Sequence, residues 1–346
     1  MMGMKEQMKY LRGKKEFEFK MIETNVPKPK HNHVLVKVLA CGVCGTDLGN
    51  LKKSDEYVPL GHEISAVVVD LGEAVTKVSI GDNVVVEDMT ACGTCSYCKS
   101  DNVDLCESMY SLDDQSGMGE YLSVHENMLV PYEGLSPPEA TFVEPLAVCI
   151  NSYLASDMPL NGNLVVWGLG PLALMTAAVA KHYNAAKVIC VGSLRGTQKN
   201  QVREKAAYLL GVDKVVYSSD EDILEQINSA LENRVDRVIT TSPPKTLPMA
   251  LEALSYGGTV VTIGLDFGEE STVPVDIDRL ILNKKNIVTF IAEPAKRFHL
   301  SIDLIKKKII PVEHLLTHII PLHDLEEFKS TFTEDSGVIK AIIVTE

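Results

Sequence analysis

The stretch LVVWGLGPLALMTAAVA, residues 164–180, decides the fold of the second half of the chain. It is apolar almost throughout, but it is short for a transmembrane helix and contains two glycines and a proline. We therefore interpret it as a buried strand, a turn and a helix. Strand-like and helix-like runs alternate after it, at 187–192, 201–211, 214–217, 235–241, 247–258 and 259–265. This alternation predicts βαβ units and a parallel sheet with helices on both faces.

The turn inside this stretch has the spacing G-x-G-x-x-A, formed by Gly168, Gly170 and Ala173. The first glycine permits a tight turn, the second lets a pyrophosphate approach the backbone, and the small third residue lets helix pack on strand. The N-terminus of the helix then faces the phosphates. Because the motif lies between a strand and a helix, it predicts a Rossmann dinucleotide-binding domain rather than a simple tight turn.

The end of the next strand indicates which dinucleotide is bound. Rossmann folds that bind NAD usually carry Asp or Glu there, which accepts hydrogen bonds from the ribose. This strand ends at Gly192 and Ser193, where no carboxylate repels a 2′-phosphate, and Arg195, Lys199 and Arg203 follow. We therefore expect NADP in preference to NAD, with Arg195 as the partner of the phosphate. The alternative is that these cations are ordinary solvated residues at the start of a helix. The predicted cofactor-binding residues are Gly168, Gly170, Pro171, Leu172, Ser193 and Arg195.

The first half of the chain has a different pattern. Short runs rich in valine and bounded by Gly, Asp or Pro occur at 33–40, 63–72, 82–88 and 120–132. These runs predict strands of an all-β, barrel-like module. After residue 290 the sequence predicts a helix, a connection, a second helix and a final strand that rejoins this module. The predicted domains are 1–152 with 290–346, and 153–289.

Four cysteines stand close together in CGTCSYCKSDNVDLC, residues 92–106. Their spacing, C-x2-C-x2-C-x7-C, allows four thiolates to surround one tetrahedral zinc ion in a compact loop. An iron–sulfur cluster and a pair of disulfides are the alternatives. We predict a structural zinc bound by Cys92, Cys95, Cys98 and Cys106, which stabilises the folded loop.

A second set of metal ligands is spread over three segments. Cys44 lies in CGTD, His62 lies in LGHE, and Glu144 is a carboxylate inside the apolar run FVEPLAV. Taken singly, Cys44 is typical of a small buried residue and His62 of a core imidazole. A buried carboxylate, however, needs a partner, and a Cys, a His and a Glu with an open fourth position suit a catalytic zinc.

Together these motifs resemble the zinc-dependent medium-chain dehydrogenase/reductase superfamily over essentially the whole chain. The motifs are CGVCGTD (41–47), GHE (61–63), the four-cysteine loop, VEPLAV (143–148), GLGPLA (168–173) and GGTVVTIG (257–264). The resemblance implies an α/β protein with a GroES-like β-barrel catalytic domain, a Rossmann doubly wound parallel sheet, and an active site in the cleft between them. It also implies a homodimer or homotetramer.

The resemblance also assigns roles to individual residues. Cys44, His62 and Glu63 match the family's catalytic-zinc positions, and Glu144 matches a further carboxylate that serves as ligand or holds water. Thr46 matches the hydroxyl that relays the alcohol proton. Many relatives then place a relay His where this chain has Gly49, so we expect Glu63 or solvent to replace it.

The Glu-Pro pair at 144–145 is similar to the sorbitol, glucose and threonine dehydrogenase branch. We therefore expect a secondary alcohol of a polyol or sugar as substrate, with threonine or a simple secondary alcohol as alternatives. Lys52 and Lys53 would suit a sugar phosphate, although such a pair is also typical of a solvated loop. A zinc-free reductase of the same superfamily and a non-catalytic dinucleotide-binding sensor are the remaining alternatives.

Size and charge narrow the function further. A chain of 346 residues is expected to form about two domains. The formal charge of −14 disfavours nucleic acid and anionic membranes as partners. The N-terminus shows no apolar signal segment, so we expect a cytoplasmic protein whose partner is a small-molecule alcohol or sugar.

Overall fold

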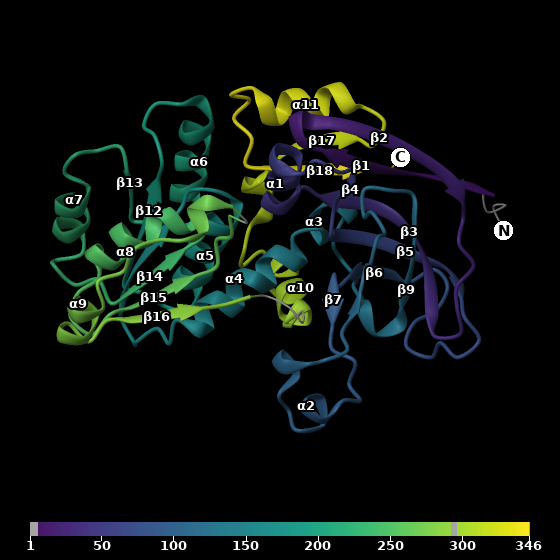
Figure 1. Ribbon diagram of the computed structural model, residues 1–346, viewed down its shortest axis with the longest axis horizontal. Coiled ribbons are helices and arrows are strands. Elements are labelled where there is room, and N and C mark those ends of the chain that lie inside the picture. The colour runs from purple at the N-terminus through teal and green to yellow at the C-terminus, as the bar shows by residue number, and fades with distance from the viewer. Residues whose placement is uncertain (1–5, 267, 292–295, 346) are drawn as a thin grey trace.

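The computed structural model describes residues 6–266, 268–291 and 296–345. It shows two bodies side by side, joined through a central helix, α4 (Val143–Ala155) (Figure 1). We call residues 163–289 the sheet body, and residues 6–142 together with 298–345 the barrel body. The domain boundary predicted at 152/153 falls inside α4, and the one predicted at 289/290 falls where the last strand of the sheet body ends.

The sheet body is a six-stranded parallel sheet in the order β13-β12-β11-β14-β15-β16. Its strands are β11 (Asn163–Trp167), β12 (Lys187–Gly192), β13 (Lys214–Tyr217), β14 (Arg237–Thr240), β15 (Thr259–Thr262) and β16 (Asn286–Thr289). The strand order reverses between β11 and β14. In a doubly wound sheet, ligands bind at this point, beyond the carboxyl ends of the strands.

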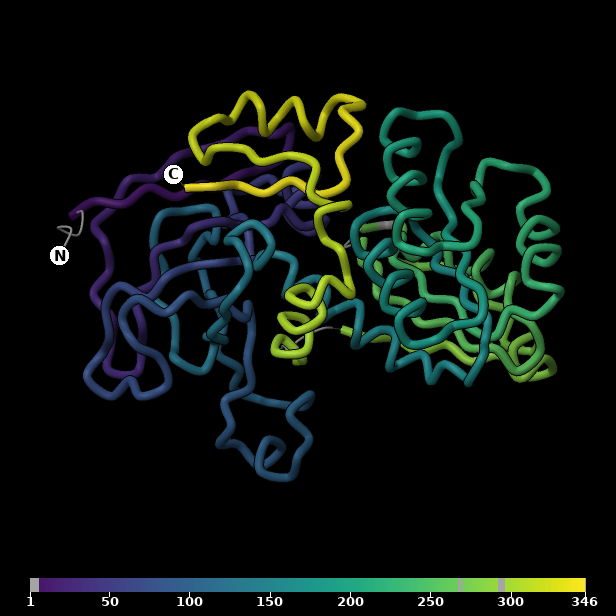
Figure 2. The backbone as a smooth tube through the Cα atoms, turned by 180° about the vertical axis from the view of Figure 1, so that it is seen from behind, coloured from purple at the N-terminus to yellow at the C-terminus, as the bar shows by residue number. Residues whose placement is uncertain are grey.

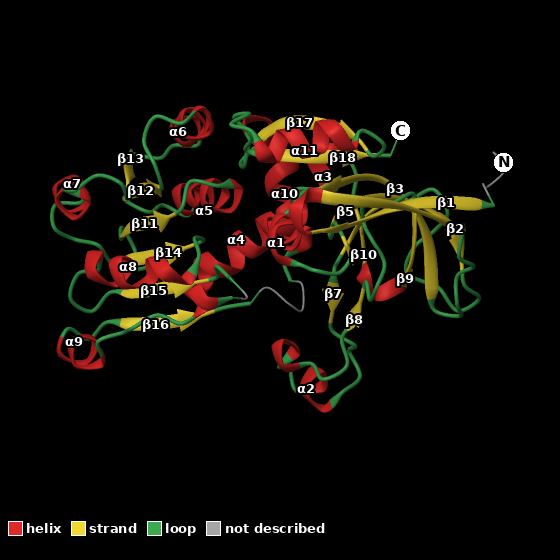
Figure 3. Ribbon diagram, turned by 45° about the horizontal axis from the view of Figure 1, so that its top comes forward, coloured by secondary structure: helices red, strands yellow, loops and turns green. Residues whose placement is uncertain are grey.

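Helices cover both faces of this sheet (Figure 3). They are α5 (Pro171–His182), α6 (Gln198–Leu209), α7 (Ile223–Ala230), α8 (Leu247–Ala253) and α9 (Ile277–Leu282). Leu164 and Val166 of β11 pack in the core that holds α4 and α5, whereas Val165 and Trp167 pack in the core that holds α7 and α8. Because both faces are buried, the strands have continuous apolar sequences. The predicted strand, turn and helix at 164–180 are confirmed.

The barrel body is built mainly from antiparallel strands. They are β1 (Gln7–Lys14), β2 (Glu18–Asn25), β3 (His33–Gly42), β4 (Val58–Pro59), β5 (Glu63–Leu71), β6 (Asn83–Val86), β9 (Tyr121–His125), β10 (Leu129–Pro131), β17 (Leu316–Pro321) and β18 (Lys340–Val344). The helices are α1 (Gly45–Lys53), α3 (Pro137–Ala140), α10 (Phe298–Lys306) and α11 (Leu325–Thr333). The α/β fold class predicted from the sequence is therefore confirmed.

The two ends of the chain meet in the barrel body. β18 pairs antiparallel with β3, so that Ile342 lies opposite Gly42, and Figure 2 shows the C-terminal segment beside the N-terminal strands. The final strand thus rejoins the first module as predicted. The sequence interpretation missed β17, which pairs parallel with β18 and precedes α11.

The four-cysteine segment forms a lobe that protrudes from the barrel body (Figure 1). It contains α2 (Ser96–Lys99) and is joined to the barrel through β7 (Met89–Thr90) and β8 (Tyr110–Ser111), which pair with each other. Within the described ranges, no helix is long and apolar enough to cross a membrane.

Candidate active site

Three predicted ligands converge where the barrel body faces the sheet body. The Cys44 Sγ, a His62 ring nitrogen and a Glu63 carboxylate oxygen all lie within 4.8 Å of one another. Cys44 immediately precedes α1, Glu63 is the first residue of β5, and His62 immediately precedes that strand. A thiolate, an imidazole and a carboxylate are the donors that zinc takes in proteins, so the chemistry and placement of this set fit one such ion.

Asp47 holds the two ligand segments together. Its Oδ2 accepts a hydrogen bond from the backbone N–H of Cys44 at 2.9 Å, and its Oδ1 accepts one from the backbone N–H of Gly61 at 2.8 Å. Gly61 has a φ of +86°, which disfavours a side chain, and a Cβ there would lie 2.5 Å from the Sγ of Cys41. Asp47, 2% exposed, therefore fixes the spacing between Cys44 and His62 instead of serving as a ligand.

The partner of Glu63 is a lysine that the sequence interpretation did not identify. Lys340, the first residue of β18, forms a buried ion pair with Glu63 and donates a hydrogen bond to the backbone oxygen of Val43 at 3.0 Å. Burial lowers the pKa of Lys340, but the neighbouring Glu63 and Cys44 raise it above its ordinary value. A lysine inside the apolar run VIKAIIV was the sequence signal for this role.

Groups that can carry a negative charge surround His62. Burial lowers the pKa of His62, but the charges of Cys44, Asp47 and Glu144 raise it well above its ordinary value. Burial raises the pKa of Glu144 well above its ordinary value, and His62 opposes that shift. Glu144 therefore lies beside the Cys44, His62 and Glu63 trio, but it is not part of the group whose ligand atoms lie within 4.8 Å of one another. The structure brings together an excess of anionic donors, as a cation site requires.

Thr46 lies at the exposed side of the trio. Its Oγ1 is 3.8 Å from the Sγ of Cys44, and the residue is exposed to solvent. A Cβ built on Gly45 or Gly49 would meet none of the described atoms within 4 Å. Water therefore has room to approach the Thr46 hydroxyl along this face of α1.

The four cysteines of the lobe also converge on one point. Their Sγ atoms lie within 4.8 Å of one another, with separations of 3.4 Å for Cys95 and Cys98 and 3.9 Å for Cys92 and Cys98. Sulfurs around a tetrahedral zinc, with bonds of about 2.3 Å, would lie roughly 3.8 Å apart. Cys92 accepts backbone hydrogen bonds from Thr94 and Cys95, and these bonds lower its pKa to about 6. All four cysteines are free of disulfides, so their geometry fits a single metal ion.

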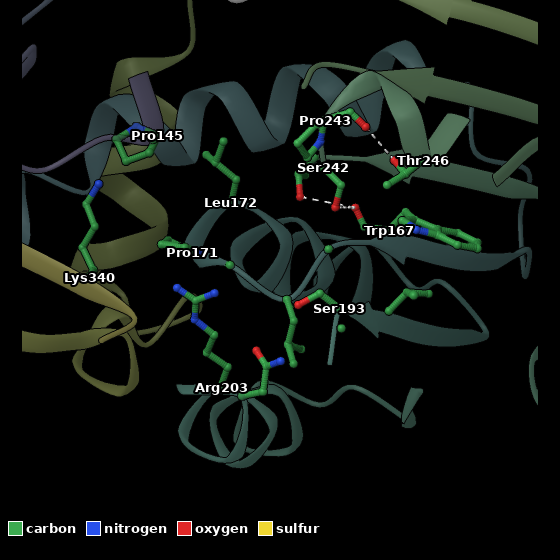
Figure 4. Close-up of a pocket in the computed structure, with 18 of the residues that line it drawn as sticks. Pro145, Trp167, Pro171, Leu172, Ser193, Arg203, Ser242, Pro243, Thr246 and Lys340 are labelled. Atoms are coloured by element: carbon green, nitrogen blue, oxygen red, sulfur yellow. Dashed lines mark hydrogen bonds between the residues drawn. The ribbon is translucent and has the colours of Figure 1, made fainter. Parts of the chain in front are cut away.

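A cavity of about 440 Å³ lies between the two bodies and reaches the first trio (Figure 4). From the barrel body it is lined by Val43, Cys44, Gly45, Glu63 and Lys340. From the sheet body it is lined by the glycine-rich turn, Gly168 to Leu172, and by Ser193, Asn200, Arg203, Ser218, Thr241, Ser242 and Pro243, among others. Five of the six predicted cofactor-binding residues therefore line the same cavity as Cys44 and Glu63.

The glycine-rich turn has the geometry that its spacing predicts. Gly168 has a φ of +145°, and a Cβ there would lie 2.3 Å from the Oγ1 of Thr241. Gly170 precedes α5, and a Cβ built on it would meet none of the described atoms within 4 Å. The first glycine is needed for the turn, and the second leaves the N-terminus of α5 open to a phosphate.

Arg195 is the sixth predicted residue, and it does not line the cavity. Its guanidinium pairs with Asp220 at 2.7 Å and lies over the Tyr217 ring, 4.5 Å from the centroid. Its role toward a 2′-phosphate stays a prediction. Arg203, one of the cations that follow it, does line the cavity, and no sequence pattern distinguishes the two arginines.

Comparison with known proteins places the chain in a family. Residues 30–134 match the family described as alcohol dehydrogenase GroES-like domain, and residues 171–307 match the family described as zinc-binding dehydrogenase. The L-threonine 3-dehydrogenase of Pyrococcus furiosus is 31% identical over 288 residues, which cover 79% of each chain. The chain belongs to the zinc-dependent medium-chain dehydrogenase/reductase superfamily.

Other members of this superfamily match still more of the chain. The sorbitol dehydrogenase of Bacillus subtilis is 27% identical over 325 residues, covering 90% of this chain and 89% of that one. The crystal structure of a zinc-binding dehydrogenase from Sinorhizobium meliloti, bound to NADP, is 25% identical, covers 98% of this chain and 100% of its own, and has a TM-score of 0.85. The superfamily and the fold predicted from the sequence are confirmed, and the protein is of the zinc- and NAD(P)-dependent alcohol dehydrogenase type.

Proposed function

We propose that the protein transfers a hydride between a secondary alcohol of a polyol or sugar and NADP. In this proposal Cys44, His62 and Glu63 hold a catalytic zinc, with Glu144 as a further ligand or water-holding carboxylate, and the lobe cysteines hold a second, structural zinc. The observation that carries the proposal is that Cys44 and Glu63 line the same cavity as Gly170. A metal at the trio and a dinucleotide on the turn would therefore meet in one space.

The residues around the trio have different roles in the proposed reaction. Zinc at such a site acts as a Lewis acid that lowers the pKa of an alcohol or polarises a carbonyl. The Thr46 hydroxyl takes the proton that leaves the alcohol and passes it to water on the exposed face of α1. Glu63 is buried against Lys340, so its geometry favours solvent over Glu63 as the exit route where relatives carry a histidine.

The substrate class rests on the relatives and on one ion pair. The sorbitol dehydrogenase and the Glu-Pro pair at 144–145 support a polyol or sugar. The Nζ of Lys53 lies 2.7 Å from Oδ1 of Asp266 and 2.6 Å from its backbone oxygen. Since this ammonium already has an anionic partner, the pair Lys52 and Lys53 gives less support to a sugar phosphate than the sequence alone does. Threonine stays the principal alternative substrate, because threonine dehydrogenases are among the relatives.

The preference for NADP rests on the end of β12. Ser193 lines the cavity where NAD-binding relatives of this fold usually carry a carboxylate. The Sinorhizobium relative was crystallised with NADP. Both observations support NADP as the cofactor.

A homodimer or homotetramer is the proposed assembly. Among the described strands, β16 pairs with β15 alone and so leaves one sheet edge unpaired. Beside it, Ile277, Ile281 and Leu282 of α9 are exposed. An unpaired edge next to apolar side chains supports association between copies. Light scattering of Ile281→Glu and of wild type tests this assembly, and the variant is expected to have the smaller mass. A dimer or tetramer that is unchanged in the variant would mean that the interface lies on another surface.

The proposed function is tested by zinc content and turnover on one preparation. We expect about two zinc ions per chain and reduction of NADP during oxidation of one polyol or sugar. The panel includes polyols, sugars, sugar phosphates, threonine and simple secondary alcohols, each with NADP and NAD. Cys44→Ser is expected to lose one zinc and all turnover. A single zinc in the wild type with no turnover on any alcohol would favour a dinucleotide-binding sensor instead.

A further inference from the structure

Asp335 connects the barrel body to the start of α6 in the sheet body. It lies in the segment 334–339 between α11 and β18, which Figure 1 shows beside α6. Its Oδ2 accepts a hydrogen bond from the backbone N–H of Gln198 at 2.7 Å, and its Oδ1 accepts one from that of Lys199 at 2.8 Å. One carboxylate of the barrel body therefore binds two successive backbone groups of the sheet body.

The start of α6 is completed only by this contact. The first backbone N–H groups of a helix have no acceptor within the helix itself. Thr197 accepts a hydrogen bond from the backbone N–H of Asn200 at 3.1 Å, whereas Gln198 and Lys199 find their acceptor in Asp335. The negative carboxylate also lies at the positive end of the helix dipole. The local sequence thus satisfies only part of this helix end, and the barrel body supplies the rest.

The segment that carries Asp335 is shaped to lie along α6. Gly337 has a φ of +73°, and a Cβ there would lie 3.1 Å from Cγ2 of Val202. A side chain at this position would therefore strain the backbone and press against α6. The backbone oxygen of Val338 accepts a hydrogen bond from Nε of Arg203, which is half-buried, at 3.2 Å. The contact between the two bodies thus continues past the first turn of α6.

The same segment leads directly to the metal trio. Lys340, which begins β18, pairs with Glu63 and lines the cavity from the barrel body. Asn200, in the first turn of α6, is 5% exposed and lines the cavity from the sheet body. The contact made by Asp335 therefore joins the wall that holds the proposed metal ligands to the wall that faces the proposed dinucleotide.

Asp335 is also a counter-charge between the two bodies. Burial lowers the pKa of Lys199, the charges of Arg203 and Lys52 lower it further, and Asp335 opposes this shift. Lys52 belongs to α1 of the barrel body, whereas Lys199 and Arg203 belong to α6. Cations of the two bodies therefore lie near one another here, and removal of Asp335 would leave their repulsion uncompensated.

We propose that Asp335 is a positioning residue that holds the sheet body against the barrel body in the arrangement that hydride transfer requires. The inference rests on the proposed function, in which a hydride passes from the carbon of an alcohol at the trio to a nicotinamide in the sheet body. The two reacting groups are thus held by different bodies. The rate of such a step depends on how closely the two bodies are aligned.

Hydrogen exchange at the start of α6 tests the contact. In Asp335→Ala, the amides of Gln198 and Lys199 are expected to exchange faster by roughly 2- to 30-fold, the range that corresponds to the loss of a capping side chain. Asp335→Asn should have a smaller effect, because its amide keeps one acceptor oxygen. The matched control is Asp324→Ala, since Asp324 caps α11 inside the barrel body by accepting the backbone N–H of Glu327 at 2.9 Å. It should leave the exchange of both amides unchanged.

Kinetics separates a contact that aligns the bodies from a local helix cap. With the alcohol that the panel identifies, Asp335→Ala is expected to lower kcat by a similar factor. The isotope effect of an alcohol deuterated at the reacting carbon should rise, because misaligned hydride transfer then limits the rate. The affinity for ADP-ribose, measured by titration calorimetry, should not fall, since no group that binds an anion is removed. Asp324→Ala should keep the wild-type kcat, although it loses a helix cap as well.

Four outcomes would overturn the proposal. They are unchanged exchange in Asp335→Ala, faster exchange with unchanged kcat and isotope effect, an equal fall of kcat in Asp324→Ala, and a fall of kcat that is matched by weaker ADP-ribose binding. Hydrogen exchange needs no alcohol. It therefore tests the contact between the bodies even if the proposed turnover is absent.

Discussion

Lys340 and Glu63 form an ion pair that is almost completely removed from solvent, with 3% and 1% of their side chains exposed. Lys340 begins β18 near the C-terminus, and Glu63 begins β5 in the first part of the barrel body. The same carboxylate belongs to the proposed metal trio. The pairing of the last strand with β3 is therefore what supplies the counter-charge to Glu63.

Removing the lysine is expected to destabilise the fold. In Lys340→Met, the Glu63 carboxylate would be buried without a partner, and breaking one side of a buried ion pair costs about 3–5 kcal/mol. Urea unfolding measures this loss, with Lys308→Met, an exposed lysine, as the control. Adding Glu63→Leu to Lys340→Met should recover most of the stability, because neither charge of the pair is then left without its partner. If Lys340→Met unfolds at the same urea concentration as wild type, this account is wrong.

Thr46 is expected to affect the rate rather than cofactor binding. Thr46→Val keeps the shape of the side chain but removes the hydroxyl, and loss of a positioned proton-transfer group lowers kcat by roughly 100- to 10,000-fold. Zinc content and the KM for NADP should not change, and Thr46→Ser should keep most of the activity. Steady-state kinetics of the three proteins would exclude the relay role if Thr46→Val turned over like wild type.

The lobe is expected to hold its metal independently of the active site. Cys98→Ser should lower the zinc content from about two to about one per chain, since a closed site needs all four thiolates. The melting temperature should fall, because the binding energy of a structural zinc contributes to folding. Metal analysis of Cys98→Ser and Cys44→Ser side by side checks this. Loss of both ions in Cys98→Ser would mean that the two sites are coupled.

Arg195 and Asp220 are expected to shift the cofactor preference in opposite directions. Arg195→Ala should raise the KM for NADP far more than the KM for NAD, because the 2′-phosphate loses its proposed partner. Asp220→Asn removes the carboxylate that now neutralises Arg195 at 2.7 Å, and should lower the KM for NADP. Equal effects of Arg195→Ala on both cofactors would contradict the assignment.

Glu87 is expected to make the stability depend on pH. Burial raises its pKa from 4.5 to about 7 in the folded protein. The pKa of Glu87 is therefore higher in the folded state than in the unfolded state. Its contribution to the free energy of unfolding is fully present below pH 4.5 and is lost as the pH rises through about 7. The loss amounts to about 3 kcal/mol, because the folded-state pKa of about 7 lies well above 4.5 and each tenfold change in proton affinity corresponds to about 1.4 kcal/mol.

Glu87→Gln tests this pH dependence. The neutral amide should leave stability at about pH 5 unchanged and raise it above pH 7, since no charge has to be buried. Urea unfolding across this range measures the difference from wild type. Parallel curves for both proteins would assign the pH dependence to other groups.

Much of the active site was predictable because its parts are local. The G-x-G-x-x-A turn and the four-cysteine lobe each lie within one short segment, so their spacing alone fixes which backbone and thiol groups converge. Cys44 and His62 lie farther apart, yet both flank turns that Asp47 connects through backbone hydrogen bonds. The sequence patterns of strands and helices likewise predicted the parallel sheet, because both of its faces are buried.

The sequence by itself determined the fold class, the family, the glycine turn and the side chains proposed as metal ligands. The tertiary structure alone decided which charges face one another: Lys340 on Glu63 and Arg195 on Asp220. The physical reason is that turns and ligand spacings depend on neighbouring residues, whose geometry the backbone restricts. The partner of a long charged side chain depends instead on how distant segments pack, and one sequence pattern is compatible with several such partners.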